Sequence, residues 1–346
     1  MNRRTVVLEL GAALACLVLS PGCSKKDEPA REMPAAAAPG EKPGAAANAP
    51  VKLTVGHDLW IGYAGVFIAN ELGLFKQAGL DVELKPFSNP GDTLPALAAG
   101  KLDIGLTTLQ NLAVLSGNGD TDVVAIALID SSNGADAVVA KEGVASMTEL
   151  KGKTVALTLG EVNHMLFLTG LKKAGVAPDD VKITSMSADD AGAAFVAGKV
   201  DAAVTWEPWI TKATKGGGHV IFSSASVPDT IMDAVAVRRS RLAESGDACS
   251  RFIGAIDQGV RVLRGEPDKA IPIVGKYLNA PPEDVKGMLA GDKIYDLAEN
   301  KQLFGTAEKA GPVYASMKAV VDFAVESKLV KKAPAPESLL DPRLVR

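Results

Sequence analysis

The chain has 346 residues, enough for two lobes that each bury a core. Its formal net charge is −4 and no basic run occurs beyond the extreme N-terminus, which argues against nucleic acid as a partner. The three cysteines and three histidines lack the spacing of a zinc site, so we expect neither a metal nor a cofactor. Because Cys16 and Cys23 precede the region of globular composition, we expect no disulfide in the folded body.

The first 22 residues have the pattern of an export signal. Two arginines are followed by an apolar run at residues 6–19, which is too short to span a membrane. The sequence Leu-Ser-Pro-Gly before Cys23 resembles the cleavage box of bacterial lipoproteins. We therefore predict a lipoprotein signal at 1–22, lipidation of Cys23, and a location in the periplasm or at the cell surface. The alternative is an ordinary secretory signal with an unmodified cysteine.

Residues 23–50 have the composition of a linker. Alanine, proline, glycine, lysine and glutamate dominate, so the segment has little apolar surface to offset the entropy of ordering. We predict a disordered, lipidated tether that holds the folded body near a membrane.

The body contains an internal repeat of alternating strands and helices. In the first copy we expect strands at 51–56, 81–87 and 104–108 and helices at 65–75 and 93–99. In the second copy we expect strands at 154–159, 181–186 and 202–206 and helices at 164–173 and 191–196. A glycine follows the helices of both copies, as a left-handed helix cap requires: Gly79, Gly100, Gly175 and Gly198. The repeated βαβαβ order predicts an α/β fold of two lobes, each a mostly parallel sheet flanked by helices.

The remainder of the chain is expected to complete the first lobe. A strand is predicted at 233–238, and apolar residues at helical spacing predict helices that include 250–263 and 314–326. We therefore assign 51–133 to the first part of lobe 1 and 134–232 to lobe 2. Residues 233–346 form the second part of lobe 1 with C-terminal helices.

Short polar side chains and two of the three tryptophans follow the predicted strands. Ligands of open α/β sheets bind beyond the carboxyl ends of the strands, so we expect these residues to line a cleft. The candidates are Asp58, Trp60, Tyr63, Asn89, Thr108, Gln110, Glu161, Asn163, Trp206 and Glu207. Glu207 either contacts a ligand or bonds to nearby backbone, and we expect His57 and His164 to be structural.

Several stretches together resemble the nitrate/sulfonate/taurine family of periplasmic substrate-binding proteins. They are Trp60-Ile61-Gly62-Tyr63, the stretch at 70–82, the stretch at 97–105 and the stretch at 200–209. The resemblance implies a type II binding-protein fold whose lobes close on a small polar solute. It also implies a monomer that delivers the solute to the permease and ATPase of an ABC importer and touches the membrane only through its lipid.

The resemblance also implies roles for two acidic residues. Asp233 matches the aspartate that pairs with the substrate amine in taurine-binding members. Glu161 stands where oxyanion-binding members carry serine or threonine. Either the solute is not an oxyanion at that point, or Glu161 turns away as a first-turn residue favoured by the helix dipole. Carboxylates mixed with the indoles of Trp60 and Trp206 favour a cationic or heterocyclic amine, with a sulfonate or nitrate as the alternative.

The sequence predicts a binding protein rather than an enzyme. It contains no GxSxG motif, no Walker loop and no evident pairing of a nucleophile with a base. Two alternatives stay open. One is a lipoprotein that senses a solute for a membrane receptor, and the other is an enzyme like those of pyrimidine or menaquinone biosynthesis on the same fold, which an export signal disfavours.

Replacing Cys23 by alanine is expected to abolish acylation, because the change removes the thiol that carries the lipid. Metabolic labelling with a fatty acid measures this, and Cys16→Ala is the matched control that should stay labelled. Label that persists in Cys23→Ala contradicts the predicted cleavage site.

Overall fold

The computed structural model describes residues 49–88, 90–119 and 121–345. The predicted signal at 1–22, Cys23 and nearly all of the predicted linker lie outside the described residues. Among the residues that are described, no helix has both the length and the apolar character needed to cross a membrane.

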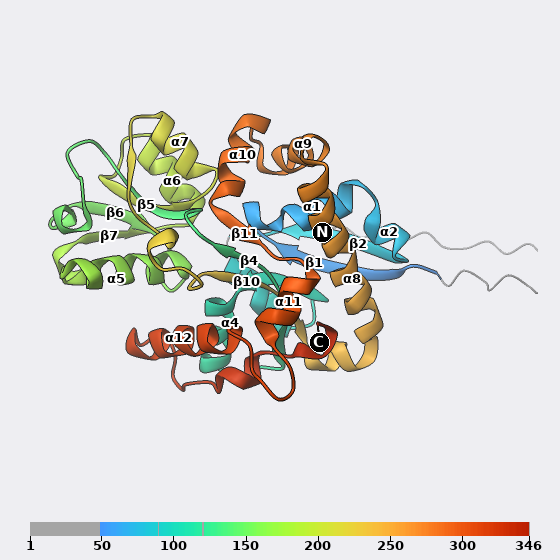
Figure 1. Ribbon diagram of the computed structural model, residues 1–346. Coiled ribbons are helices and arrows are strands. Elements are labelled where there is room, and N and C mark those ends of the chain that lie inside the picture. Colours follow the sequence, from blue (N-terminus) through green and yellow to red (C-terminus); the bar gives the residue numbers. More distant parts are fainter. Residues whose placement is uncertain (1–48, 89, 120, 346) are drawn as a thin grey trace, which may run out of the picture. The chain divides into compact units, whose positions relative to one another are not determined.

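Two mixed sheets form the body (Figure 1). The first has the order β11 (Asp292–Ile294), β4 (Val123–Ser132), β10 (Met232–Arg238), β3 (Ile104–Thr108), β1 (Val51–His57) and β2 (Leu80–Pro86). The second has the order β7 (Lys182–Ser185), β6 (Thr154–Leu157), β8 (Ala202–Trp206), β5 (Asp136–Ala140) and β9 (His219–Ser223). The chain passes between the sheets from β4 to β5 and again from β9 to β10. The exact lobe boundaries stay predictions.

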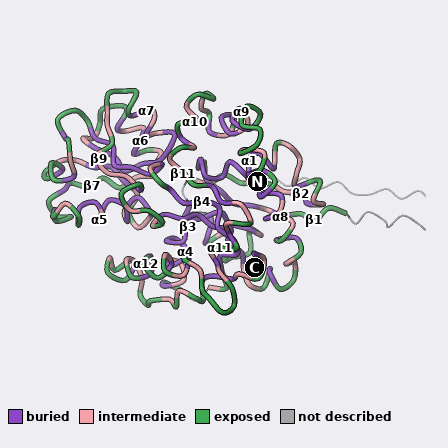
Figure 2. The backbone as a smooth tube through the Cα atoms, in the orientation of Figure 1, coloured by how far each residue is buried: buried purple, intermediate pink, exposed green. Residues whose placement is uncertain are grey.

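Helices flank both sheets. They are α1 (Ala64–Glu71), α2 (Leu74–Gln77), α3 (Thr93–Ala98), α4 (Leu109–Asn118), α5 (Val162–Ala174), α6 (Ala188–Val196), α7 (Trp209–Lys215), α8 (Arg239–Gly265), α9 (Pro267–Leu278), α10 (Pro282–Ala290), α11 (Leu297–Phe304) and α12 (Val313–Glu326). Figure 2 shows that the central strands are buried while the outer helices alternate between buried and exposed residues. Alternation of this kind is the pattern of helices that cover a sheet with one apolar face.

The repeat predicted from the sequence is present in both sheets. The strands of each copy pair in parallel, β2 and β3 with β1, and β7 and β8 with β6. The strands outside the repeat, β4, β10 and β11 in one sheet and β5 and β9 in the other, pair antiparallel. Each sheet is therefore mixed rather than mostly parallel, because the strands at the two crossings, β4 and β5 and then β9 and β10, pair antiparallel, as does the short strand β11.

The aspartate of each repeat copy binds a backbone amide of the first strand in that copy. Asp103 accepts a hydrogen bond from the amide of Thr54 at 2.9 Å, and Asp201 accepts one from the amide of Thr154 at 2.8 Å. The glycine before each aspartate has a positive φ, 75° at Gly100 and 70° at Gly198. Both features were visible in the repeated Ala-Gly-Lys-x-Asp sequence, and the left-handed glycine caps are confirmed.

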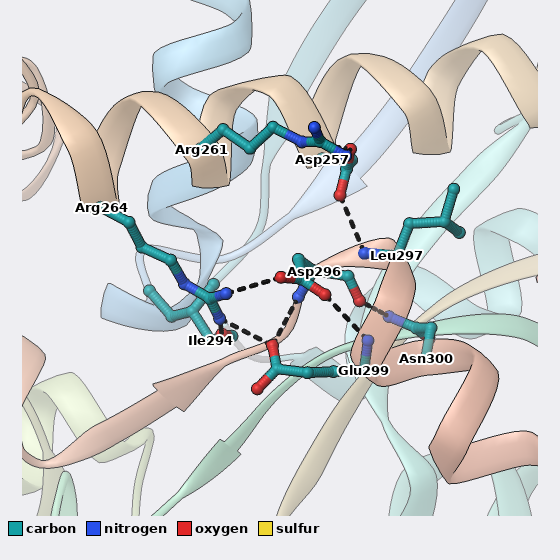
Figure 3. Close-up of polar contacts among 8 residues, drawn as sticks. All are labelled: Asp257, Arg261, Arg264, Ile294, Asp296, Leu297, Glu299 and Asn300. Atoms are coloured by element: carbon teal, nitrogen blue, oxygen red, sulfur yellow. Dashed lines mark hydrogen bonds and ion pairs between the residues drawn. The ribbon is translucent and has the colours of Figure 1, made fainter.

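A polar network joins α8 to the start of α11 (Figure 3). Asp296 and Glu299 form a capping box, and Arg264 donates to both carboxylates, at 2.6 and 2.7 Å. Asn300 pairs with the backbone of Leu128, accepting from its N–H at 2.7 Å and donating to its carbonyl at 2.9 Å. The network fixes α11 against β4, the strand that carries Asp130.

Two glycines allow α1 and α8 to pack closely. A Cβ placed on Gly259 would lie 2.1 Å from the carbonyl oxygen of Gly65, a backbone atom that cannot rotate away. Gly254, on the same helix, has no neighbour within 4 Å of such a Cβ. The first site needs glycine for packing, and the second does not.

Gly259→Ala is therefore expected to lower the free energy of unfolding by roughly 1–3 kcal/mol, because the helices must separate. The matched control Gly254→Ala is expected to raise it by up to about 1 kcal/mol through helix propensity. Chemical denaturation measures both. Equal stabilities of the two variants would show that α1 and α8 are not held at this distance.

Candidate functional site

Four aspartates of the first sheet and its connections gather with one that begins the second sheet. They are Asp58 after β1, Asp130 on β4, Asp233 on β10, Asp292 on β11 and Asp136 at the start of β5. Asp233 is the register partner of Asp130, and the start of β11 pairs with the end of β4. The exposed fractions of Asp58, Asp130, Asp136 and Asp233 are 3, 0, 2 and 4%. We call these five residues the acidic cluster.

Two aromatic side chains bind the acidic cluster from the short helical turn after β1. The indole Nε1 of Trp60 donates to Asp130 Oδ2 at 3.1 Å, and the Tyr63 hydroxyl donates to Asp233 Oδ1 at 2.8 Å. A Cβ on Gly62 would lie 2.0 Å from Asp130 Oδ2, so glycine is needed where the turn meets the carboxylate. The motif Trp60-Ile61-Gly62-Tyr63, part of the family resemblance, thus binds two of the carboxyl groups.

Most of the cluster retains free hydrogen-bonding capacity. Within the acidic cluster, the buried oxygens without a hydrogen-bond partner are Asp58 Oδ1, Asp130 Oδ1, Asp136 Oδ2 and both carboxylate oxygens of Asp292. A buried polar atom with no partner costs about 1–3 kcal/mol, more when it is charged. Oxygens left open in this way are acceptors for a group that the protein itself does not supply.

Burial without compensation raises the pKa of every member of the cluster. It raises the pKa of Asp136 to about 7 and that of Asp233 to about 6. The pKa values of Asp58, Asp130 and Asp292 lie well above the ordinary range, through burial first and then through repulsion by neighbouring aspartates. Among the causes of these shifts in the described part of the chain, no lysine or arginine side chain occurs, and only the backbone of Lys293 lowers the pKa of Asp292. The cluster is a concentration of carboxyl groups with no lysine or arginine side chain to offset their charge when they ionise.

Glu161 lies in a different group, against a loop of the first sheet. A Cβ on Gly91 would be 2.1 Å from Glu161 Oε1, so this carboxylate is in contact with the loop. Beside it, Gln110 Nε2 donates to the carbonyl of Gly160 at 2.8 Å. A pocket of about 350 Å³ is lined by both Gly91 and Glu161. Burial raises the pKa of Glu161 to about 7, and Glu161 Oε2 is buried without a hydrogen-bond partner.

The predicted residues of the second sheet have several different contacts. Trp206 and Trp209 both donate to Asp189 Oδ1, at 3.1 and 2.8 Å. The pKa of Asp58 is raised first by burial, then by the charge of Asp233, and last by the charge of Asp189. The tryptophan pair therefore reaches the acidic cluster through Asp189. Thr211 donates to both carboxylate oxygens of Glu207, from its amide at 2.9 Å and from its hydroxyl at 3.0 Å. Of the two alternatives for Glu207, the structure therefore shows a bond to nearby backbone.

Of the other predicted residues, one caps a helix and one is buried without hydrogen-bond partners. Thr108 caps α4 by accepting from the amide of Asn111 at 3.1 Å. Asn163 is fully buried, and neither its amide oxygen nor its amide nitrogen has a partner. Asn89 lies outside the described residues. His57 Nδ1 lies 2.8 Å from the carbonyl oxygen of Asp58. His164 Nδ1 accepts a hydrogen bond from the amide of Gly160 at 3.3 Å.

Sequence reasoning missed Asp130, Asp136 and Asp292, because it predicted no strand at β4, β5 or β11. A signal was present for two of them. Asp130 ends the apolar run 123–129, and Asp136 precedes the apolar run 137–140. A charged residue at the border of a buried strand indicates a site at the sheet edge. No group of three or more acidic, histidine or cysteine side chains in the described part of the chain is arranged to hold a metal ion.

The acidic cluster is expected to make the free protein less stable as the pH rises. Because the folded-state pKa values of Asp136 and Asp233 lie above their unfolded values, the stability they contribute is fully present below about pH 4 and is lost as the pH rises through 6 to 7. From pH 5 to pH 8 the free energy of unfolding should fall by on the order of 3 kcal/mol. Denaturant titration measures this. Asp136→Asn should flatten the slope, the exposed Asp247→Asn should not, and a stability that rises with pH contradicts the assignment.

Comparison with known proteins places the chain in a family. The model of the NMT1/THI5-like family matches residues 60–270. A binding protein of Brucella abortus is 33% identical over 235 residues, which cover 67% of this chain and 72% of the relative. The taurine-binding periplasmic protein of Escherichia coli is 26% identical over 269 residues, 75% of this chain and 81% of that protein.

The fold has a close structural counterpart. The crystal structure of the periplasmic aliphatic sulphonate-binding protein of Escherichia coli superimposes with a TM-score of 0.70 at 22% identity, covering 86% of this chain and 99% of that one. These relatives are binding proteins and not enzymes. The chain therefore belongs to the NMT1/THI5-like family and is a solute-binding protein with the two-sheet α/β fold of type II periplasmic binding proteins.

Proposed function

We propose that the chain captures a small organic cation between its two sheets and delivers it to an ABC importer. The observation that carries this proposal is the acidic cluster, in which buried carboxyl groups have unpartnered oxygens and, within the described residues, no lysine or arginine side chain among the causes of their pKa shifts. Proteins pair their buried charges, so an uncompensated cluster needs a partner from outside the chain. A cation with N–H groups supplies both the charge and the donors.

Charge also argues against an anion at this position. Two like charges 4 Å apart repel by about 4 kcal/mol at an effective dielectric constant of 20. An alkanesulfonate or nitrate would meet Asp233 and its neighbours with no cation of its own. Taurine, the solute named for one relative, differs from both because it carries an ammonium group besides its sulfonate. The solute named for this relative is therefore compatible with a solute that presents a cation to Asp233.

Contacts between parts of the chain that belong to different sheets support capture by closure. Gln110 of α4 binds Gly160, and Glu161 touches Gly91. Lys215 of α7 forms an ion pair with Asp284 of α10. Such contacts form when two lobes meet and break when they part, as in hinge closure around a solute. Closure would bring Asp136 and Asp189 from the second sheet to the aspartates of the first.

We also propose that the protein is exported and held at the membrane by lipid on Cys23. The support is the sequence pattern of residues 1–22 together with the periplasmic location named for the relatives. A permease and an ATPase would be its partners. A solute-sensing role with a membrane receptor is the second candidate, and the same pocket would serve it.

Asp233→Asn is expected to weaken a cationic solute by about 10- to 100-fold, because it removes a charge-assisted hydrogen bond worth about 1.5–3 kcal/mol. Calorimetric titration of the full chain with an alkylamine, taurine and an alkanesulfonate measures this. The matched control is Asp247→Asn, which removes one exposed charge on α8 and should leave all affinities unchanged. Tight alkanesulfonate binding that survives Asp233→Asn would exclude a cationic solute and leave the family assignment intact.

A further inference from the structure

One carboxyl group lies where segments of the two sheets meet. Glu161 stands between β6 and α5, and its Oε1 would lie 2.1 Å from a Cβ on Gly91, in the short turn before α3. Beside it, Gln110 of α4 donates to the carbonyl of Gly160 at 2.8 Å. We call these two interactions the Glu161 contact, and the conformation in which they are formed the closed one. Hinge opening between the sheets would separate both.

The Glu161 side chain does not cap its own helix. Glu161 is the N-cap residue of α5, where the free amides and the dipole of a helix stabilise a carboxylate, yet its side chain makes no capping hydrogen bond. It lies against Gly91 instead, and its Oε2 is buried without a partner. In the closed conformation this oxygen has therefore lost contact with water and gained no hydrogen bond.

The surroundings of the Glu161 contact offer little compensation to an ionised carboxylate. The amide nitrogen of Gln110 is used by Gly160, and that of Asn111 is buried without a partner. An ionised group buried in this way is costly unless it is paired. The apolar side chains that line the pocket of about 350 Å³ beside it come from α3 and α4: Leu94, Pro95, Val114 and Leu115.

The titratable groups near Glu161 supply no positive charge. Asp92 follows Gly91 in the opposing turn, and His164 on α5 accepts a hydrogen bond at Nδ1 from the amide of Gly160. The side chains of α3 and α4 that line the pocket carry no titratable group. Burial is the main cause that raises the pKa of Glu161 to about 7, and the charge of Asp92 adds to it.

We propose that Glu161 couples closure of the two sheets to the uptake of one proton. The protonated carboxyl group is accommodated in the Glu161 contact, whereas the ionised carboxylate favours the open conformation, in which it is hydrated at the N-terminus of α5. This inference goes beyond the function proposed above, because it concerns closure of the free protein and not the charge of the solute.

The direction and size of the pH dependence follow from the two conformations. When the sheets are apart, Glu161 is solvated and its pKa should lie near the usual value of about 4.3. In the closed conformation that pKa is raised to about 7. The contribution of Glu161 to closure is therefore fully present below about pH 4 and is lost as the pH rises through 7. Between pH 6 and pH 8 the ratio of closed to open protein should fall about tenfold.

Small-angle X-ray scattering of the full chain without solute tests this at pH 6 and pH 8. We expect the radius of gyration of the wild type to increase with pH as the open fraction grows. Glu161→Gln keeps the shape of the side chain but cannot ionise, so its radius should stay small at both pH values. The matched control is Glu142→Gln, which removes an exposed carboxylate after β5 and should behave as the wild type does.

A second measurement and a second variant make the test independent of how well Glu161→Gln closes. Infrared difference spectroscopy detects the carbonyl stretch of a protonated carboxyl group, and the wild type should lose a band between pH 6 and pH 8 that Glu161→Gln lacks at both. Gly91→Ala places a methyl group where Glu161 Oε1 lies, so this variant should be open at both pH values and should also lack the band. Circular dichroism checks that each variant is folded.

Two results would overturn the inference. One is a wild-type radius of gyration that is the same at pH 6 and pH 8. The other is a Glu161→Gln variant that expands with pH as much as the wild type, which would assign the response to other carboxyl groups such as Asp136, whose pKa burial raises to about 7. Both results leave the family assignment and the cationic solute in place.

Discussion

Burial of carboxylates without a counter-ion is the constraint on which the rest of this structure depends. Asp58, Asp130, Asp136 and Asp233 are nearly inaccessible to solvent, yet no basic side chain of the described chain offsets them. Removing ionised groups from water costs several kcal/mol each, and the fold meets this cost in part by keeping some carboxyls protonated. In the function proposed here, a cationic solute would restore the missing pairing and recover this free energy.

The surrounding elements hold these carboxylates in position. The turn that contains Trp60 and Tyr63 approaches closely because Gly62 has no side chain, and its two donors orient Asp130 and Asp233. On the other side, Asn300 pairs with the backbone of β4 and couples the strand to α11. A site anchored from both sides is preorganised, so little conformational entropy is lost when the solute binds.

Polar contacts join the two sheets, beside apolar ones such as Trp206 of β8 and Ala188 of α6, which belong to the core cluster of the first sheet. Glu161 against Gly91, Gln110 against Gly160 and the ion pair of Lys215 with Asp284 join segments that belong to different sheets. Contacts of this kind contribute little to stability individually. They suit a joint that must open for the solute to leave, whereas the apolar cores of the sheets suit parts that move as rigid bodies.

The sequence by itself determined the repeat, the glycine caps, the class of fold and the family resemblance. These are local or periodic properties: Gly100 and Gly198 cap helices, and the strand at 104–108 is apolar throughout. It also singled out Asp58, Trp60, Tyr63 and Asp233, whose role in binding stays a prediction. Only the tertiary structure decided that Asp130, Asp136 and Asp292 join them, and that Glu207 binds Thr211 while Glu161 faces Gly91. The physical reason is that β4, β10 and β11 come from distant parts of the chain and pair antiparallel, so no local pattern records which carboxylates meet.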